Sequence, residues 1–214
     1  MRKRIRDLVI LLLATTPVFA AGPGDFCAGH SSPSVGQWAK YRMDVPFLNE
    51  KMESRYAVVA TQAVDGREHF WLEMLVPMAG GTMIMQFLVP GYPYDGDTVR
   101  GMVMKMGDAM PAMVYPPEMA GSMSSNDSLS KPLQIACDQS ESGTVESVTV
   151  PAGTFRALRV PARGLGKDIW ISADVPFGLI KMAEPEGKGL ELIAYGADAE
   201  SSITETPQKM PGME

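Results

Sequence analysis

Alternation of apolar and polar residues with a period of two runs through most of this sequence. In residues 37–45, Ala39, Tyr41 and Met43 alternate with Lys40 and Arg42. Successive side chains of a strand point to opposite faces, so this pattern predicts a half-buried strand. Asp65-Gly66 separates two further alternating runs, 55–64 and 67–76, and predicts a tight hairpin because both turn positions require positive φ.

The same pattern predicts about nine strands in all, the others at residues 82–89, 144–150, 154–160, 168–173, 179–183 and 189–195. The segment from 91 to 131 is less regular. We expect a strand or short helical turn at 102–113 and then a loop from Tyr115 to Ser130, because Gly101, Gly107 and Pro111 oppose a long helix. The predicted fold is therefore mainly β, a curved antiparallel sheet or half-open barrel with little helix.

The N-terminus has the pattern of a secretory signal peptide. Four basic residues precede an apolar run from Leu8 to Ala14, and Val18 and Ala20 suit a cleavage site after residue 20. We therefore expect export to the periplasm, a single β-rich domain at 21–196 without a transmembrane segment, and a disordered polar tail at 197–214.

Charge and motifs exclude several classes of function. Residues 1–20 contain four basic residues and one acidic residue, so their removal changes the formal charge from −6 to −9, which disfavours nucleic acid as a partner. The chain has two histidines, His30 and His69, and neither lies in a recognisable catalytic motif. We expect no enzymatic activity and no cofactor.

Two cysteines, Cys27 and Cys137, follow the expected cleavage site. An even number of cysteines in an oxidising compartment favours pairing, and the chain has no Cys-x-x-Cys motif that would indicate redox activity. We predict one intramolecular disulfide.

Methionine is unusually frequent, with 17 residues, and a dense group lies between Met83 and Met123. Thioethers are soft ligands suited to Cu(I), and one strand face would present either Met83 with Met85 or Met102, Met104 and Met106 to a single ion. Methionine is equally suited to filling cores and to lining surfaces that adapt to more than one ligand shape. We favour the second interpretation and keep copper binding by this trio as an alternative.

The predicted strands have a broad apolar face on which we expect a ligand to bind. Long helices that would cover this face completely are not predicted, so water or an apolar molecule should contact part of it. The candidate ligand-binding residues are Tyr41, Met43, Phe70, Leu72, Met74, Met85 and Phe87.

Three stretches carry a resemblance to a known group. They are Gln37-Trp38-Ala39-Lys40-Tyr41-Arg42, Val150-Pro151-Ala152-Gly153-Thr154-Phe155, and Trp170-Ile171-Ser172 followed by Val175-Pro176-Phe177-Gly178-Leu179-Ile180-Lys181. These resemble uncharacterised periplasmic proteins grouped with the lipoprotein-localisation carriers (LolA/LolB-like). The resemblance implies an incomplete, strongly curved antiparallel barrel around a hydrophobic cavity that holds lipid-linked or other apolar ligands. A non-catalytic periplasmic binding protein is thus expected; the alternatives are copper binding and a structural role in an envelope complex, contacted through an exposed sheet edge.

Overall fold

The computed structural model describes residues 22–28, 32–45, 50–124, 129–184 and 189–209. The predicted signal peptide, residues 1–20, lies outside this part of the chain. The described residues form one open sheet of 12 strands in the order β12-β6-β5-β4-β3-β2-β1-β11-β10-β9-β8-β7. The strands are β1 (Trp38–Val45), β2 (Glu50–Val64), β3 (Arg67–Met78), β4 (Gly81–Val89), β5 (Gly101–Met106), β6 (Met113–Tyr115), β7 (Thr144–Val150), β8 (Gly153–Ala162), β9 (Lys167–Ile171), β10 (Leu179–Ala183), β11 (Gly189–Gly196) and β12 (Gln208–Lys209).

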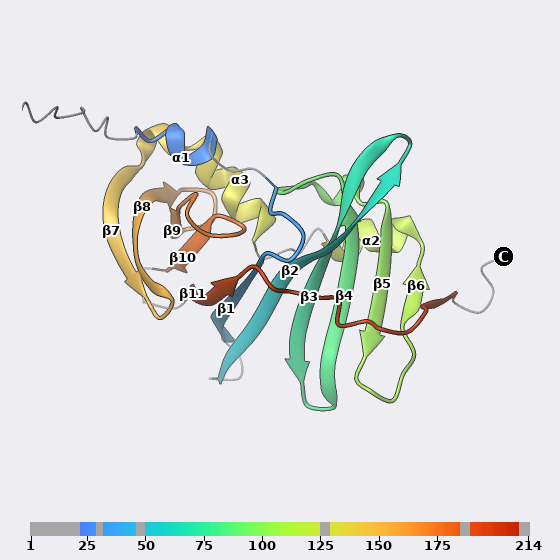
Figure 1. Ribbon diagram of the computed structural model, residues 1–214. Coiled ribbons are helices and arrows are strands. Elements are labelled where there is room, and N and C mark those ends of the chain that lie inside the picture. Colours follow the sequence, from blue (N-terminus) through green and yellow to red (C-terminus); the bar gives the residue numbers. More distant parts are fainter. Residues whose placement is uncertain (1–21, 29–31, 46–49, 125–128, 185–188, 210–214) are drawn as a thin grey trace, which may run out of the picture.

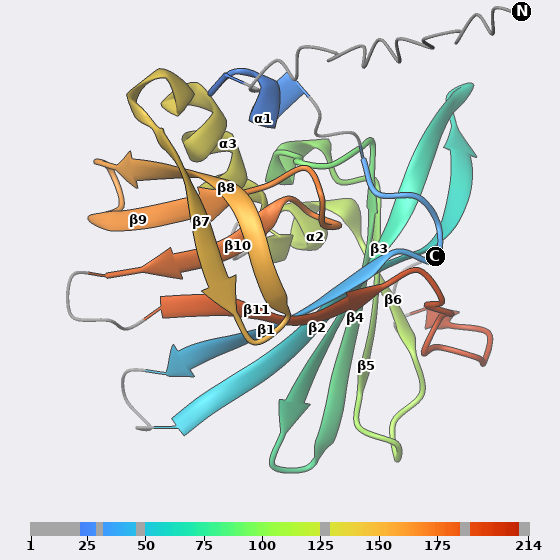
Figure 2. The same ribbon diagram turned by 60° about the vertical axis from the view of Figure 1, so that its left-hand side comes forward.

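The predicted mainly-β fold class is confirmed. All strand pairs are antiparallel except β12 with β6. The half of the sheet from β7 to β1 curls strongly, and the half from β2 to β6 extends away from it (Figures 1 and 2). The curl brings the β7–β8 turn to β11, where the Ala152 N–H donates to the Leu192 carbonyl at 3.3 Å. The sheet is nevertheless open, with β7 and β12 at its two ends.

Turn residues set the predicted hairpin between β2 and β3. Asp65 and Gly66 both have positive φ, 52° and 74°, and Val64 pairs with Arg67 across the turn. A bulge between Val58 and Ala60 shifts the register farther along the pair. On the side of the bulge away from the turn, the apolar residues of both strands, such as Val58 and its partner Leu72, lie on the same face of the sheet. We call this the inner face because it faces the helices.

The helices are short: α1 (Asp25–Ala28), α2 (Pro117–Ser124), α3 (Ser130–Asp138), and two 3-10 turns, η1 (Gly96–Thr98) and η2 (Ser140–Ser142). The prediction of a loop from Tyr115 to Ser130 is wrong for Pro117–Ser124, which form α2. Pro117 suits the first position of a helix, and Ala120 is fully buried. Gly121 packs so closely on η1 that an added Cβ would lie 3.1 Å from the Gly96 carbonyl oxygen. Tertiary packing thus forms a helix that the local sequence does not predict.

The predicted disulfide between Cys27 and Cys137 is confirmed. It joins α1 to α3, with Cα atoms 5.5 Å apart. Figure 1 shows the two helices side by side at one end of the curled half, so the bridge fixes the N-terminal segment to α3.

The prediction of a disordered tail is wrong for residues 197–209, which we call the C-terminal strap; residues 210–214 lie outside the described part of the chain. The strap crosses the outer face of the sheet, in front of β2–β5 in Figure 1, while α2 lies behind these strands. Asp198 accepts a hydrogen bond from Trp38 Nε1 at 2.7 Å, and Glu205 pairs with Lys105 at 2.7 Å. Polar side chains hold this segment, so it needs no periodic apolar face.

The hydrophobic core lies between the inner face and α3. Its largest fully buried side chains include Tyr41, Tyr56, Leu72 and Phe87 from β1–β4, with Leu133 from α3. The Tyr41 hydroxyl donates to the Leu179 carbonyl at 3.0 Å, so a buried hydrogen bond links β1 to β10 across β11.

Candidate functional site

The structure brings the seven predicted ligand-binding residues to the inner face, at different depths. Four of them are core residues, with relative exposures of 0% for Tyr41, 1% for Leu72 and Phe87, and 9% for Met85. Met43, Phe70 and Met74 are half-buried and pack against the core. A ligand on this face would therefore contact the half-buried residues, while the buried four support the surface from below.

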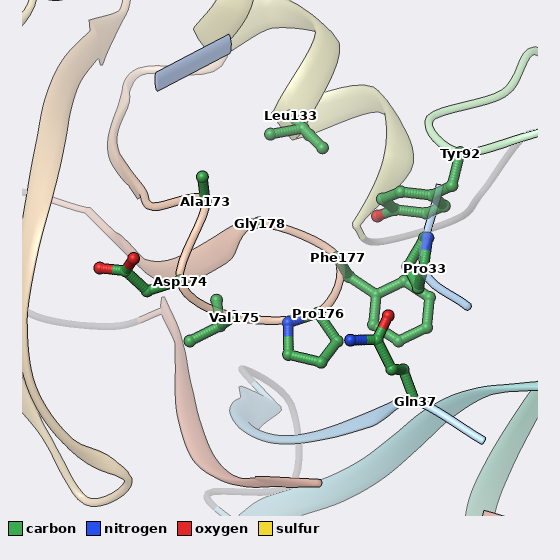
Figure 3. Close-up of a pocket in the computed structure, with 10 residues that line it drawn as sticks. All are labelled: Pro33, Gln37, Tyr92, Leu133, Ala173, Asp174, Val175, Pro176, Phe177 and Gly178. Carbon is green, nitrogen blue, oxygen red and sulfur yellow. The ribbon is translucent and has the colours of Figure 1, made fainter. Parts of the chain in front are cut away.

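The centre of the curled half is filled by a loop between β9 and β10. Phe177 of this loop packs edge-on against Tyr92, with ring centroids 5.1 Å apart, and lies 6.2 Å from Tyr56. Figure 3 shows Phe177 and Tyr92 beside a small cavity of about 110 Å³ bounded by Leu133 of α3 and by the loop backbone. Small-molecule sites usually occupy about 300–1,000 Å³, so this cavity is too small for an acyl chain.

Methionines face one another across four strands on the inner face. In one row, Met74 of β3 pairs with Met85 of β4, which pairs with Met104 of β5, which pairs with Met113 of β6. In the next row, Met83 of β4 pairs with Met106 of β5. Directly paired residues share a face and have Cβ atoms about 5 Å apart. We call these six residues the methionine rungs.

Exposure increases along this surface, away from the core. Met102, in the row behind the rungs, is fully buried, and Met85 is 9% exposed. Met74, Met83, Met104 and Met113 are half-buried, while Met106 is 48% exposed. Met78, 52% exposed, ends β3 before the β3–β4 turn, and Met110, 53% exposed, lies in the turn after β5; a hydrogen bond from the Gly107 N–H to the Thr82 carbonyl joins the two regions. In Figure 1 the β3–β4 and β5–β6 turns lie at the lower ends of the strands, below the level of α2.

The sequence-based list of residues for an apolar ligand includes Met74 and Met85 but not Met83 or Met113. The alternation in residues 82–89 places Met83 on the same face as Met85, so that signal was present for Met83. Met113 belongs to a strand of three residues, which is too short to show a period. The register between consecutive strands decides which methionines lie opposite each other, and alternation within a single strand does not give that register.

The described residues contain little that suits acid-base catalysis or a conventional metal centre. His69 is 6% exposed and its Nδ1 lies 3.2 Å from the Arg67 carbonyl oxygen, as expected for a packing histidine; His30 lies outside the described part. No group of three or more His, Cys, Asp or Glu side chains there is placed to hold a metal ion. Hydrogen bonds from Lys40 and then Arg42 lower the pKa of Glu53, and one from Lys105 lowers the pKa of Glu205. Both shifts arise in ion pairs on the outer face.

None of the helices in the described residues has the length and apolar character needed to span a membrane. A comparison of the chain with protein-family models finds no match, and a comparison with curated proteins finds no similar sequence.

Proposed function

We propose that this protein is a non-catalytic periplasmic binding protein that holds an apolar, lipid-like ligand against the methionine rungs. The observation that carries the proposal is the gradient of exposure on one continuous apolar face, from buried Met102 through half-buried Met104 to exposed Met106. A surface of this kind is apolar, continuous with the core and accessible at its outer end.

Energetics and side-chain chemistry support an acyl chain as the ligand. Full burial of a methylene group contributes roughly 0.8 kcal/mol, and an open face gives part of that for each carbon. Methionine is unbranched and polarisable, so the rungs can adapt to chains of different shape. The half-buried Met43 and Phe70 extend the same face toward both ends of the strands.

The proposed fold family is LolA/LolB-like, as the resemblance of the β7–β8 and β9–β10 hairpins implies. An open, strongly curled antiparallel sheet with short helices against its inner face supports this proposal. Because the central cavity is too small for an acyl chain, we propose the open end of the inner face as the position of the ligand. Export to the periplasm is part of the proposal and rests on the sequence of residues 1–20.

A dye-binding experiment tests the ligand site. The native protein should bind the environment-sensitive dye 1-anilinonaphthalene-8-sulfonate at one saturable site, and a long-chain fatty acid should displace it. Met104→Glu should weaken dye binding about tenfold or more, because it places a charge among half-buried thioethers. Fluorescence titration measures both effects. Met110→Glu is the matched control, since it adds the same charge at an exposed loop position outside the rungs.

Equal dye binding by the wild type and the folded Met104→Glu variant would contradict the ligand site. A structural role in an envelope complex would then become the leading proposal. For such a role the strand β7 is the relevant edge, because among the described strands it pairs on one side only and has 7 residues, whereas β12 at the other end has 2.

Copper binding is the second candidate, and the strand register favours it. Met102, Met104 and Met106 share one face as predicted, but Met102 is fully buried between Phe87 and Tyr115 in its row. The register instead places Met83 opposite Met106, next to Met104 and its partner Met85. Thioethers on adjacent strands are soft donors that suit Cu(I), so Met83, Met104 and Met106 replace the original trio as candidate ligands.

A leucine triple variant separates the two candidates. Met83→Leu, Met104→Leu and Met106→Leu together conserve volume and remove the sulfur atoms. We expect weaker than micromolar Cu(I) affinity in the wild type and retained dye binding in the variant, because histidine and cysteine are absent from the rungs. Competition with a chromogenic Cu(I) chelator measures the affinity. Micromolar or tighter binding that vanishes in the variant would place copper first.

A further inference from the structure

A groove lies on the outer face of β1–β4, on the opposite side of the sheet from the methionine rungs. Arg55 lies in its floor, paired with Lys40 on one side and Leu75 on the other. Leu75, Pro77 and Trp38 supply apolar lining, and Asp198 of the C-terminal strap also lines the groove. Its volume of about 510 Å³ falls within the range of small-molecule sites. The groove is independent of the proposed function.

The side chain of Arg55 makes no hydrogen bond or ion pair with any residue that the structure describes. Its guanidinium carbon lies 5.4 Å from the centre of the Trp38 ring, and its Nε is buried without a hydrogen-bond partner. The neighbouring basic residues differ, because Lys40 and Arg42 both pair with Glu53. Arg55 is therefore a cation oriented by an aromatic ring, with its terminal nitrogens available to a ligand.

A second arginine, Arg159, also lies over a tryptophan ring but has a carboxylate partner as well. Arg159 lies 5.5 Å from the centre of the Trp170 ring, and it also pairs with Asp168 across the β8–β9 ladder. The bond to Asp168 raises the pKa of Arg159 above its usual value. The position that Asp168 fills for Arg159 has no counterpart for Arg55 among the described residues.

We propose that Arg55 and Trp38 bind the carboxylate of a small, singly charged amphiphile whose apolar body lies on Leu75 and Pro77. Arginine binds carboxylates through two parallel N–H bonds, and the stacked indole holds the guanidinium plane in place. Glu53 and Asp198 border the groove and would repel a second negative charge. The groove should therefore prefer a monoanionic carboxylate to a dianionic phosphate.

Nuclear magnetic resonance with three eight-carbon probes tests this assignment on the mature, disulfide-bonded protein. Octanoate should shift the Trp38 indole and Arg55 Nε signals saturably. Octyl phosphate as the dianion should bind several-fold more weakly, and octanol should leave the Arg55 signal unchanged. Arg55→Gln should weaken octanoate binding about tenfold or more. Arg159→Gln is the matched control, because it removes an arginine from the other stacked pair and should leave the affinity unchanged.

A charge-removal variant gives an effect of opposite sign. Asp198→Asn keeps an oxygen that accepts the bond from Trp38 Nε1 and removes a negative charge at the groove, so octanoate should bind a few-fold more tightly. The Met104→Glu variant should retain the Trp38 shift, which separates this site from the methionine rungs. Absence of a saturable shift at millimolar octanoate, equal binding to Arg55→Gln, or an equal response to octanol would each overturn the proposal.

Discussion

Replacing Cys27 and Cys137 together with alanine should lower the free energy of unfolding by about 3–4 kcal/mol. The bridge closes a loop over a sequence separation of 110 residues, and on the chain-entropy model a 100-residue loop contributes about 4.7 kcal/mol before native-state relaxation. The four-residue helix α1 depends on this link, because its buried side chain is Phe26 alone. Urea denaturation of the oxidised wild type and the double variant measures the difference.

The reduced wild type is the control for this comparison. It contains both sulfur atoms without the cross-link, so its midpoint should fall to that of the double variant if loop closure supplies the stabilisation. A double variant as stable as the oxidised wild type would show that the rest of the fold already restricts the N-terminal segment. Loss of stability in the variant but not on reduction would indicate lost packing at the two positions.

Local turn chemistry made the hairpins predictable from the sequence. Asp65 and Gly66 adopt the positive φ angles that a tight hairpin requires, and Gly153 and Gly178 do the same in the second half, at 140° and 69°. Each signal lies within a few residues of the strands that it joins. The order of the whole sheet depends on pairs such as β1 with β11, which are distant in sequence and leave no local signal.

The helix α2 and the C-terminal strap were not predictable for a related reason. The α2 sequence contains Gly121 and two serines, which are poor helix formers, and its stabilising contact is with η1. The strap is held by hydrogen bonds and an ion pair to the outer face. Hydrophobic periodicity does not report such contacts, so a polar segment with defined partners resembles a disordered one.

Alternation predicts the face on which a side chain lies but not its depth. Leu72 and Met74 are two residues apart on the inner face, yet Leu72 is 1% exposed and Met74 is half-buried. Leu72 belongs to the buried core cluster, whereas Met74 packs at its margin, and the alternation of β3 is the same for both residues. The sequence therefore predicts the face of the sheet on which the candidate residues lie. Their exposure on that face can be read only from the structure.

On the outer face, too, alternation fails to predict how deeply a side chain is buried, and Glu73 is the example. Alternation predicts a solvated glutamate there, but its relative exposure is 0% because the strap covers it. Its Oε1 accepts from the Ser202 hydroxyl at 2.8 Å, and its Oε2 accepts from the Ser202 N–H at 2.9 Å and from Gln86 Nε2 at 2.8 Å. One buried carboxylate thus satisfies three donors and fixes the strap to the sheet.

Glu73→Ala should therefore lower the free energy of unfolding by about 2–4 kcal/mol. Hydrogen bonds to a charged group contribute about 1.5–3 kcal/mol each without adding fully, and the variant leaves the Ser202 N–H without its acceptor. Glu53→Ala is the matched control, because this glutamate lies on the same face but is half-exposed, and its ion pairs to Lys40 and Arg42 are screened by water. Urea denaturation compares the two variants, and limited proteolysis within 197–209 reports release of the strap. A smaller loss for Glu73→Ala than for Glu53→Ala, or a strap that resists protease equally in both, would show that Glu205 and the β12 pairing hold the segment without Glu73.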